Sequence, residues 1–325
     1  MIMGKEEAER NMEQFTVTVN QLITFFILIV LGLIAARFHV LDETTLNGLS
    51  RLVIRVVLPI MMFYKLLTGS TREGLLAALV VLPISLVLYG VLALLAQICI
   101  RIFHLEGNRA RVFRVLLMFG NVGFMGIPLI QVLCPDSGMV YVALFTVVDQ
   151  LLFWTVGWWN SLPVTQTTGG LQLKSLKNML SPAIFAIILS LAMVLLNLSL
   201  PDVVMTTFSA ISTACMPLSL IYMGGLLYFT DIRPALKCGE LYVEILVKMI
   251  LLPLLVFIVL HALYPETELA TTLAILTALP AISSVAMLCR QNGSDGDYAI
   301  SAVMLTTVAC LITLPLVSLG ISFFS

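Results

Sequence analysis

Long apolar runs separated by short polar clusters follow one another along almost the whole chain. A helix that crosses the hydrocarbon core of a bilayer needs about 20 predominantly apolar residues. This length predicts ten spans, with charged residues, proline or glycine at most boundaries, after a polar tail at 1–15. The spans are expected at 16–36, 47–68, 74–102, 112–134, 138–161, 179–199, 203–229, 236–264, 269–291 and 297–323. The pattern predicts an all-α, multi-pass membrane protein.

The composition supports this prediction and argues against several other classes of protein. Of the 325 residues, 60% are hydrophobic and 11% are charged, whereas a soluble domain has about 25% charged residues. The net charge of −1 does not favour a nucleic-acid partner. The cysteines form no CxxC pair and the histidines no HExxH motif, so we expect no metal site, no cofactor and no enzyme activity.

The basic residues predict which side each connection faces. If the N-terminus is outside, twelve of the seventeen lysines and arginines fall at the inner connections and adjoining helix ends, and four fall outside. Cytoplasmic loops carry an excess of Lys and Arg, so both termini are expected outside the cell membrane, which we take to be a bacterial inner membrane.

The longest connection divides the predicted spans into two groups of five. A cytoplasmic linker at 162–178 would separate a first five-helix repeat, 16–161, from a second, 179–325. Because five is odd, a duplicated second half would lie inverted in the membrane. Pro59 and Pro217, and likewise Pro128 and Pro280, lie roughly one half-length apart, as expected for an inverted-repeat transporter. Chance is the alternative, because prolines are common in membrane helices.

Helix-breaking residues interrupt the fourth and ninth spans. The stretch GNVGFMGIPL, 120–129, contains three glycines and Pro128, and Pro280 lies in the ninth span. Unwound backbone at this depth must be buried in protein or face a wet cavity. We expect half-helices to begin beyond the two prolines near the bilayer centre, where their positive N-terminal ends favour a carboxylate.

These breaks supply the predicted substrate site. Asn121 is the most informative side chain, since its amide can donate to a carboxylate; alternatively, it caps the kink. The serines after the second break either contact substrate or bond back to their own helix, and the glycines either approach substrate or permit close helix packing. The predicted substrate-binding residues are Asn121, Gly123, Ile127, Pro128, Pro280, Ser283 and Ser284.

Two ionisable residues within the spans are candidates for proton coupling. Asp149 lies in the fifth span and Lys248 in the eighth. Charged groups at this depth are costly and are usually functional or paired. Asp149 alternatively acts as a structural acceptor, and Lys248 alternatively pairs with Glu244 one turn earlier.

Four stretches in this order resemble the auxin efflux carrier family, which includes plant PIN-type carriers and bacterial malate or malonate permeases. They are FGNVGFMGIPLI (119–130), SPAIFAIILSL (181–191), MPLSLIYMGGLL (216–227) and LPAISSVAMLCRQNGSDGDYAISAVMLTT (279–307). The short inner connection resembles the bacterial branch.

The resemblance implies the fold of the bile-acid–sodium symporters, with helices 1, 2, 6 and 7 as scaffold and helices 3–5 and 8–10 as transport part. It also implies that helices 4 and 9 cross where they break, that Asn121, Pro128 and Pro280 match the crossover residues, and that the protein is a homodimer.

The expected function is secondary transport of a small organic anion, such as malate, malonate or an auxin-like acid, by elevator-type alternating access. Coupling to H⁺ or Na⁺ and plain uniport all stay open. A sodium-coupled bile-acid-type symporter is the main alternative. An intramembrane enzyme or sensor is a further alternative, which would require a catalytic dyad. A channel is the last, but breaks directed at a closed central site favour a carrier.

Overall fold

The structure is a computed structural model that describes residues 20, 23–69, 71–166, 182–229, 231, 233–264 and 266–324. The predicted tail at 1–15 and most of the predicted linker at 162–178 lie outside these residues. Among the residues described, the chain is helical and forms no strand, apart from one isolated bridge between Gly120 and Ala281.

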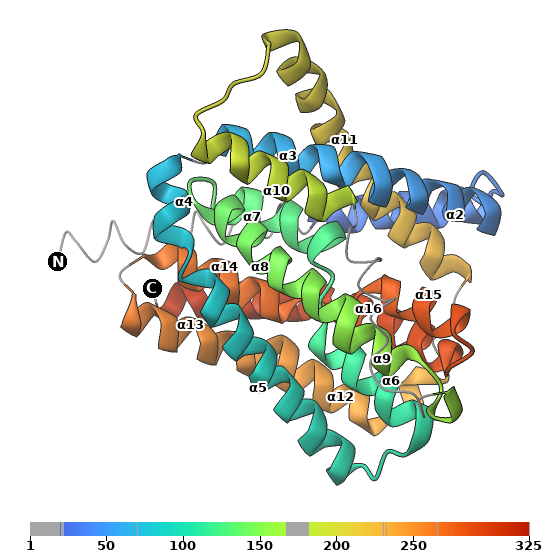
Figure 1. The fold of residues 1–325 in the computed structure, drawn as a ribbon. Coiled ribbons are helices and arrows are strands. Elements are labelled where there is room, and N and C mark those ends of the chain that lie inside the picture. The colour runs from blue at the N-terminus through green and yellow to red at the C-terminus, as the bar shows by residue number, and fades with distance from the viewer. Residues whose placement is uncertain are drawn as a thin grey trace.

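Within the described residues, the first half contains five helical runs, several with a π-helical turn inside them (Figure 1). They are Ile23–Arg37; α2 (Glu43–Leu52), η1 (Val53–Val57) and α3 (Leu58–Gly69); α4 (Arg72–Ala78) and α5 (Val81–Ile102); α6 (Gly107–Met118), η2 (Val122–Gly126) and α7 (Ile127–Leu133); and α8 (Gly138–Leu152), η3 (Phe153–Gly157) and α9 (Trp158–Ser161). A short 3₁₀ turn, η4 (Val164–Gln166), follows.

The part of the second half that the structure describes also contains five helical runs. They are α10 (Pro182–Leu195); α11 (Asp202–Phe229); α12 (Gly239–Leu246), η7 (Val247–Leu251) and α13 (Leu252–Leu263); α14 (Thr267–Ala278) and α15 (Ser283–Gln291); and α16 (Gly296–Phe324). A 3₁₀ turn, η6 (Ala235–Lys237), precedes α12.

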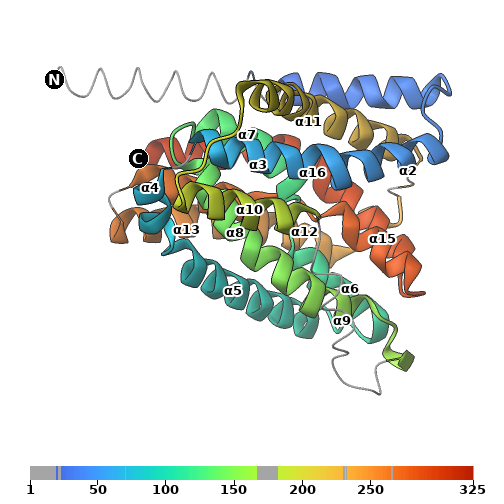
Figure 2. The ribbon, with the colours of Figure 1, turned by 45° about the horizontal axis from the view of Figure 1, so that its top comes forward.

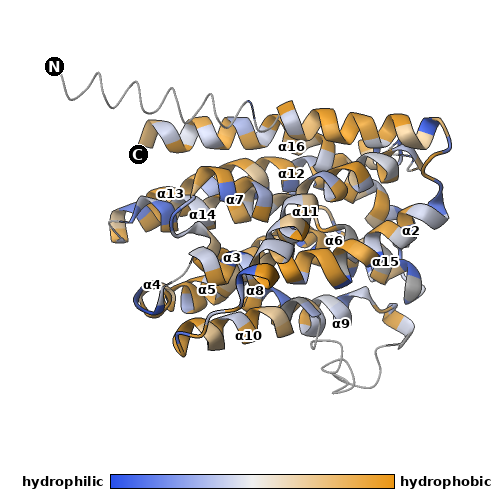
Figure 3. Cartoon of the chain, turned by 90° about the horizontal axis from the view of Figure 1, so that it is seen from above, coloured by the Kyte–Doolittle hydropathy of each residue, from blue (hydrophilic) through white to orange (hydrophobic). Residues whose placement is uncertain are grey.

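These runs overlap all ten predicted spans. Six of them are long and apolar enough to cross a membrane, and three shorter helical stretches, Ile23–Arg37, Phe185–Leu195 and Thr267–Ala278, are also apolar. Figure 3 shows hydrophobic residues along the helices and hydrophilic residues mainly near their ends. The prediction of an all-α protein with several membrane-length helices is therefore confirmed for the described residues, whereas the ten-span inverted topology stays a prediction.

The helices pack in two groups that lie on opposite sides of the molecule (Figures 1 and 2). In the first group, α3 packs against α10 and α11, and α11 also contacts α2. In the second, α5 packs against α6 and α8, α13 against α14, and α16 against α12, α14 and α15. The groups meet where α8 contacts α3 and α10 and where η2 contacts α11.

Glycines allow one very close helix contact within the first group. A Cβ atom added to Gly32 of the helix Ile23–Arg37 would overlap the carbonyl of Ile221, and one added to Gly224 of α11 would overlap the carbonyl of Ile29. Small residues at such contacts let helix backbones approach in lipid, where van der Waals packing is a main source of association.

We expect Gly224→Ala to lower the thermal stability of the purified protein by about 1–3 kcal/mol, because the added methyl group overpacks a backbone contact. Gly90→Ala on α5 is the matched control, since a Cβ there meets open space. The control should melt at or above the wild-type temperature in detergent, because Ala is the better helix former. Equal melting temperatures of the two variants would contradict this packing role.

Candidate functional site

Two interrupted helical runs meet in the interior of the protein. One interruption follows α6, which ends at Met118, and the other follows α14, which ends at Ala278. The Asn121 N–H donates to the Pro280 carbonyl at 2.8 Å, and the Ile282 N–H donates to the Phe119 carbonyl at 3.2 Å. Each break thus pairs backbone groups of the other, as buried backbone requires where no water is available. The expected convergence of the two breaks is confirmed.

The first break lies upstream of the position that the proline predicts. Helical backbone begins directly after residues 119–121 and continues through Pro128, so the expectation of a half-helix starting beyond Pro128 is wrong. The reason is that the π-helical turn η2 directly precedes α7, and such a local change in the hydrogen-bond pattern accommodates the missing N–H of Pro128. The Asn121 carbonyl instead receives the N–H groups of Met125 and Gly126, both at 3.1 Å.

The second break does include its proline. Residues 279–282 are not helical, and α15 begins at Ser283. Gly120 faces Ala281 across the bridge, and the residue before each of them is the acceptor: Phe119 accepts from Ile282, and Pro280 accepts from Asn121. Phe119, and not Pro128, therefore has the position in the first break that Pro280 has in the second. The matched spacing of Pro128 and Pro280 therefore does not mark equivalent positions at the crossing.

The glycines around Asn121 permit close packing. A Cβ on Gly120 would lie 3.1 Å from Leu279 Cβ, and one on Gly126 would lie 2.7 Å from Leu279 Cδ1. A Cβ on Gly123 would lie 2.8 Å from Leu58 Cδ1 of α3. Gly120 and Gly126 therefore face the second interrupted run, and Gly123 faces the first helix group.

The other predicted substrate residues lie close to the same crossing. Asn121 is fully buried, at 0% exposure, and Ile127 and Pro128, six and seven residues later in the same helical segment, are buried too. Pro280 is buried at the second break and Ser284 is half-buried in the first turn of α15. The side chain of Ser283 lies outside the described part of the structure.

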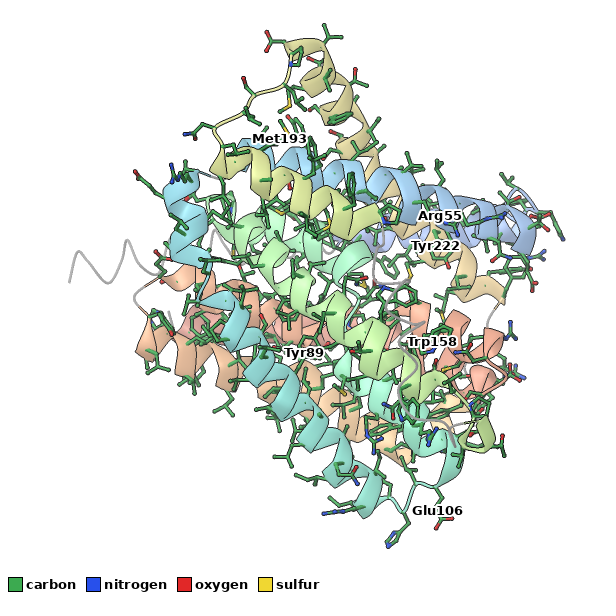
Figure 4. All side chains as sticks on the ribbon, viewed as in Figure 1. Arg55, Tyr89, Glu106, Trp158, Met193 and Tyr222 are labelled. Atoms are coloured by element: carbon green, nitrogen blue, oxygen red, sulfur yellow. The ribbon has the colours of Figure 1, made fainter. Side chains whose placement is uncertain are left out.

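Asp149 lies in a satisfied hydrogen-bond site near the first break, because the ring of its partner Tyr89 lies 5.4 Å from the ring of Phe119. Its carboxylate accepts from the Tyr89 hydroxyl of α5 and from Gln150 Nε2 at 2.9 Å. Tyr89 points toward the interior between the helices (Figure 4). This arrangement fits the alternative role of Asp149 as a structural acceptor, and its donors are the side chains of Tyr89 and Gln150. Tyr89 was missed because a single tyrosine in an apolar run carries no signal of its partner.

Lys248 caps the broken end of α6. Its side chain is buried, and its ammonium donates to the Leu116 carbonyl at 3.1 Å. A helix leaves its last four carbonyls without intrahelical partners and carries partial negative charge at that end, so a cation there is favourable. Nζ also lies 4.0 Å from Glu244 Oε1, so the i,i+4 pair that was the alternative for Lys248 is present at the long limit of an ion pair.

Three arginines near the predicted inner ends of the helices connect neighbouring segments. Arg109 Nη2 lies 2.5 Å from Glu240 of α12, and its guanidinium stacks over the ring of Tyr298. Arg114 donates to Asn160 and Gln97, at 2.9 and 2.7 Å, and Arg111 donates to the Leu162 carbonyl. Besides any contact with lipid, these side chains hold helices together.

A cavity of about 410 Å³ separates the two helix groups near α2, α11, α15 and α16. Its wall includes Asn47 and Tyr222 on one side and Arg290, Asp297 and Ser301 on the other; Figure 4 labels Tyr222. Of the predicted substrate residues whose side chains the structure describes, none lines it, but Ala286 does, one turn beyond the start of α15. The cavity thus ends close to the second break.

Comparison with known proteins identifies the family. The model of a family described as membrane transport protein matches residues 17–168 and 170–318. The chain belongs to the auxin efflux carrier family. It is also 24% identical over 306 residues to an uncharacterized transporter of Methanothermobacter thermautotrophicus, which covers 93% of this chain and 98% of that protein. The two matched stretches meet inside the predicted linker at 162–178.

We expect Lys248→Met to destabilise this family member by about 1–3 kcal/mol, because the buried Leu116 carbonyl then lacks a donor. Thermal unfolding in detergent measures the loss. Lys237→Met is the matched control, since Lys237 is exposed and surface substitutions usually change stability by less than about 0.5 kcal/mol. If both variants melt together with the wild type, Lys248 does not support the broken helix.

Proposed function

We propose that this carrier moves small organic anions, namely carboxylates of the malate, malonate or auxin-like type, by secondary transport with an elevator-type motion. The observation that carries the proposal is the buried crossing of two interrupted helical runs, which are joined by the Asn121–Pro280 and Ile282–Phe119 backbone bonds. Discontinuous helices in transporters characteristically form substrate sites near the bilayer midplane.

The electrostatics of the crossing favour an anion. The helical segment at 122–133 and the helix α15 both start beside the bridge, so the positive ends of two helix dipoles point into one region. The Asn121 amide and the half-buried Ser284 add neutral hydrogen-bonding groups there. A carboxylate would gain from these fixed dipoles without requiring a buried countercharge.

The two helix groups supply surfaces for relative movement. The scaffold would consist of the helices Ile23–Arg37, α2–α3, α10 and α11, and the transport part would consist of the remaining helices. Gly123 contacts Leu58 at the boundary between these parts, so movement of the transport part would carry the crossing along the scaffold. A homodimer formed through the scaffold would hold that scaffold still.

The cavity between the groups is the proposed access route from the inner side. It lies at the end of the molecule where Arg290 and Arg233 are found, and basic residues favour the cytoplasmic side. In this proposal both termini are outside, and the structure corresponds to an inward-facing state.

We expect Asn121→Ala to reduce uptake of radiolabelled malonate, malate or indole-3-acetate into proteoliposomes by about 10- to 100-fold. The reason is that a hydrogen bond to a charged group contributes about 1.5–3 kcal/mol. Asn197→Gly is the control, since Asn197 has a φ of 54° that glycine adopts freely. Wild-type uptake by Asn121→Ala would remove Asn121 from the site, and strict dependence on sodium would favour the bile-acid-type symporter.

We expect a membrane-impermeant thiol reagent to modify Ile300→Cys, at the cavity, only from the cytoplasmic side. Val203, at the start of α11, is 79% exposed, and Val203→Cys is the matched control, which should react only from outside. The native cysteines are all buried and should react slowly. Intact cells and inverted vesicles, followed by mass measurement, give the two labelling patterns. Reaction of Ile300→Cys in intact cells would reverse the proposed orientation.

A further inference from the structure

Glu244 is the least compensated charged group in the described core. Its side chain has an exposure of 0%, and among the described residues neither of its carboxylate oxygens has a hydrogen-bond partner. The nearest cation, Lys248 Nζ, lies 4.0 Å away and donates to the Leu116 carbonyl. An ionised carboxylate in this position pays a large desolvation cost without the hydrogen bonds that normally offset it.

The two other buried carboxylates are different. Asp149 accepts from Tyr89 and Gln150. Glu240 Oε1 accepts from Arg109 Nε at 2.9 Å and from the Tyr298 hydroxyl at 3.0 Å. Both receive hydrogen-bond donors, which offset part of the cost of burying a charged carboxylate. Glu244 is therefore the carboxylate whose surroundings best fit a reversible change of protonation.

Glu244 also lies on a continuous line of ionisable groups. Glu240, Glu244 and Lys248 recur every four residues along α12 and η7, so they share one helix face. At one end of this face, Arg109 contacts Glu240 and is 43% exposed. At the other end, Lys248 contacts α6 just before its break. The line therefore connects solvent at the proposed inner side with the interrupted helix.

The groups that face Glu244 do not form a metal site. The charged groups that act on it are Glu240 on its own helix and Lys248 on η7, and the neutral ionisable groups near it are Cys99 on α5 and Tyr298 on α16. No cluster of three or more His, Cys, Asp or Glu suited to a metal occurs in the described ranges. Sodium or another metal ion would also be repelled by the Lys248 ammonium and would need several further oxygen ligands.

We propose that Glu244 binds the proton that is transported together with the anion. This inference rests on the proposed transport function and adds the identity of its coupling ion. A proton from water at the inner or outer side joins one carboxylate oxygen of Glu244, and Lys248 keeps its own proton. The transport part then gains one positive charge, which offsets one negative charge of the bound carboxylate. Release of the anion and loss of the same proton to water restore the starting state.

Infrared difference spectroscopy of the purified protein tests proton binding without a known substrate. Between about pH 5 and pH 9, the wild type should show the C=O stretch of a protonated carboxyl group that disappears as the pH rises. Glu244→Gln should lack this band, and Asp149→Asn, the control for a buried carboxylate, should keep it. No titrating band in the wild type, a band that persists in Glu244→Gln, or a band lost only in Asp149→Asn would overturn the proposal.

An isotope measurement covers the case in which Glu244→Gln does not fold. Wild-type protein labelled with ¹³C at the glutamate side-chain carboxyl should show the titrating band at a shifted position. An unshifted band would assign the proton to aspartate and overturn the proposal.

Transport by proteoliposomes tests the coupling. With the membrane potential clamped at zero, an inwardly directed gradient of one pH unit should let the wild type accumulate malonate or malate up to about tenfold. Glu244→Gln should only equilibrate the probe while retaining its exchange, and Glu73→Gln, an exposed control, should accumulate it. Accumulation by Glu244→Gln, or accumulation driven by sodium alone, would overturn the proposal. If no probe is transported by the wild type, that failure counts against the proposed substrate class, whereas the infrared result still decides proton binding.

Discussion

Pairing of backbone polar groups in an apolar interior is the constraint on which this structure depends. Two helical runs are interrupted in the interior, and an open N–H or C=O group there would cost several kcal/mol. The interruptions are possible because the segment at 119–121 and the segment at 279–282 hydrogen-bond to each other. Neither break can be considered alone, since each one supplies the acceptor that the other requires. The crossing is therefore a single structural unit made from both halves of the chain.

Buried side chains complete what the backbone bridge leaves open. The hydrogen bonds of the bridge do not include the Leu116 carbonyl of α6. This carbonyl accepts from Lys248, which lies in η7 directly before α13. This places a positive charge at the negative end of the helix and leaves Glu244 as its distant counterion. Asp149 accepts hydrogen bonds from Tyr89 and Gln150. The interior thus combines one helix cap, one satisfied carboxylate and one poorly compensated carboxylate, which are three different electrostatic situations for groups that look alike in the sequence.

Prediction succeeded where a property depends on local composition and failed where it depends on the partner. Helical runs overlap all the expected spans, because hydrophobic length is a local property. The glycine-rich stretch and Asn121 correctly indicated the first break, but Pro128 gave a wrong start for the following helix. A proline lacks an N–H donor, but this does not determine where the helix begins. Here a π-helical turn before α7 accommodates Pro128 within a helical segment. The contacts of Tyr89 with Asp149 and of Lys248 with Leu116 join residues 60 and 132 positions apart, beyond the reach of spacing arguments.

The sequence by itself determined the class of protein, the extent of the apolar helices, the two places where they break and membership of the auxin efflux carrier family. These properties follow from hydrophobic length, from residues that disfavour helix, and from the motifs that carry the family resemblance. Only the tertiary structure decided that Gly120 faces Ala281, that Lys248 caps α6, and that Glu244 lacks hydrogen-bond donors within the described residues. The physical reason is that the pairing of a buried polar group depends on which helix packs beside it, and this is a property of the folded chain.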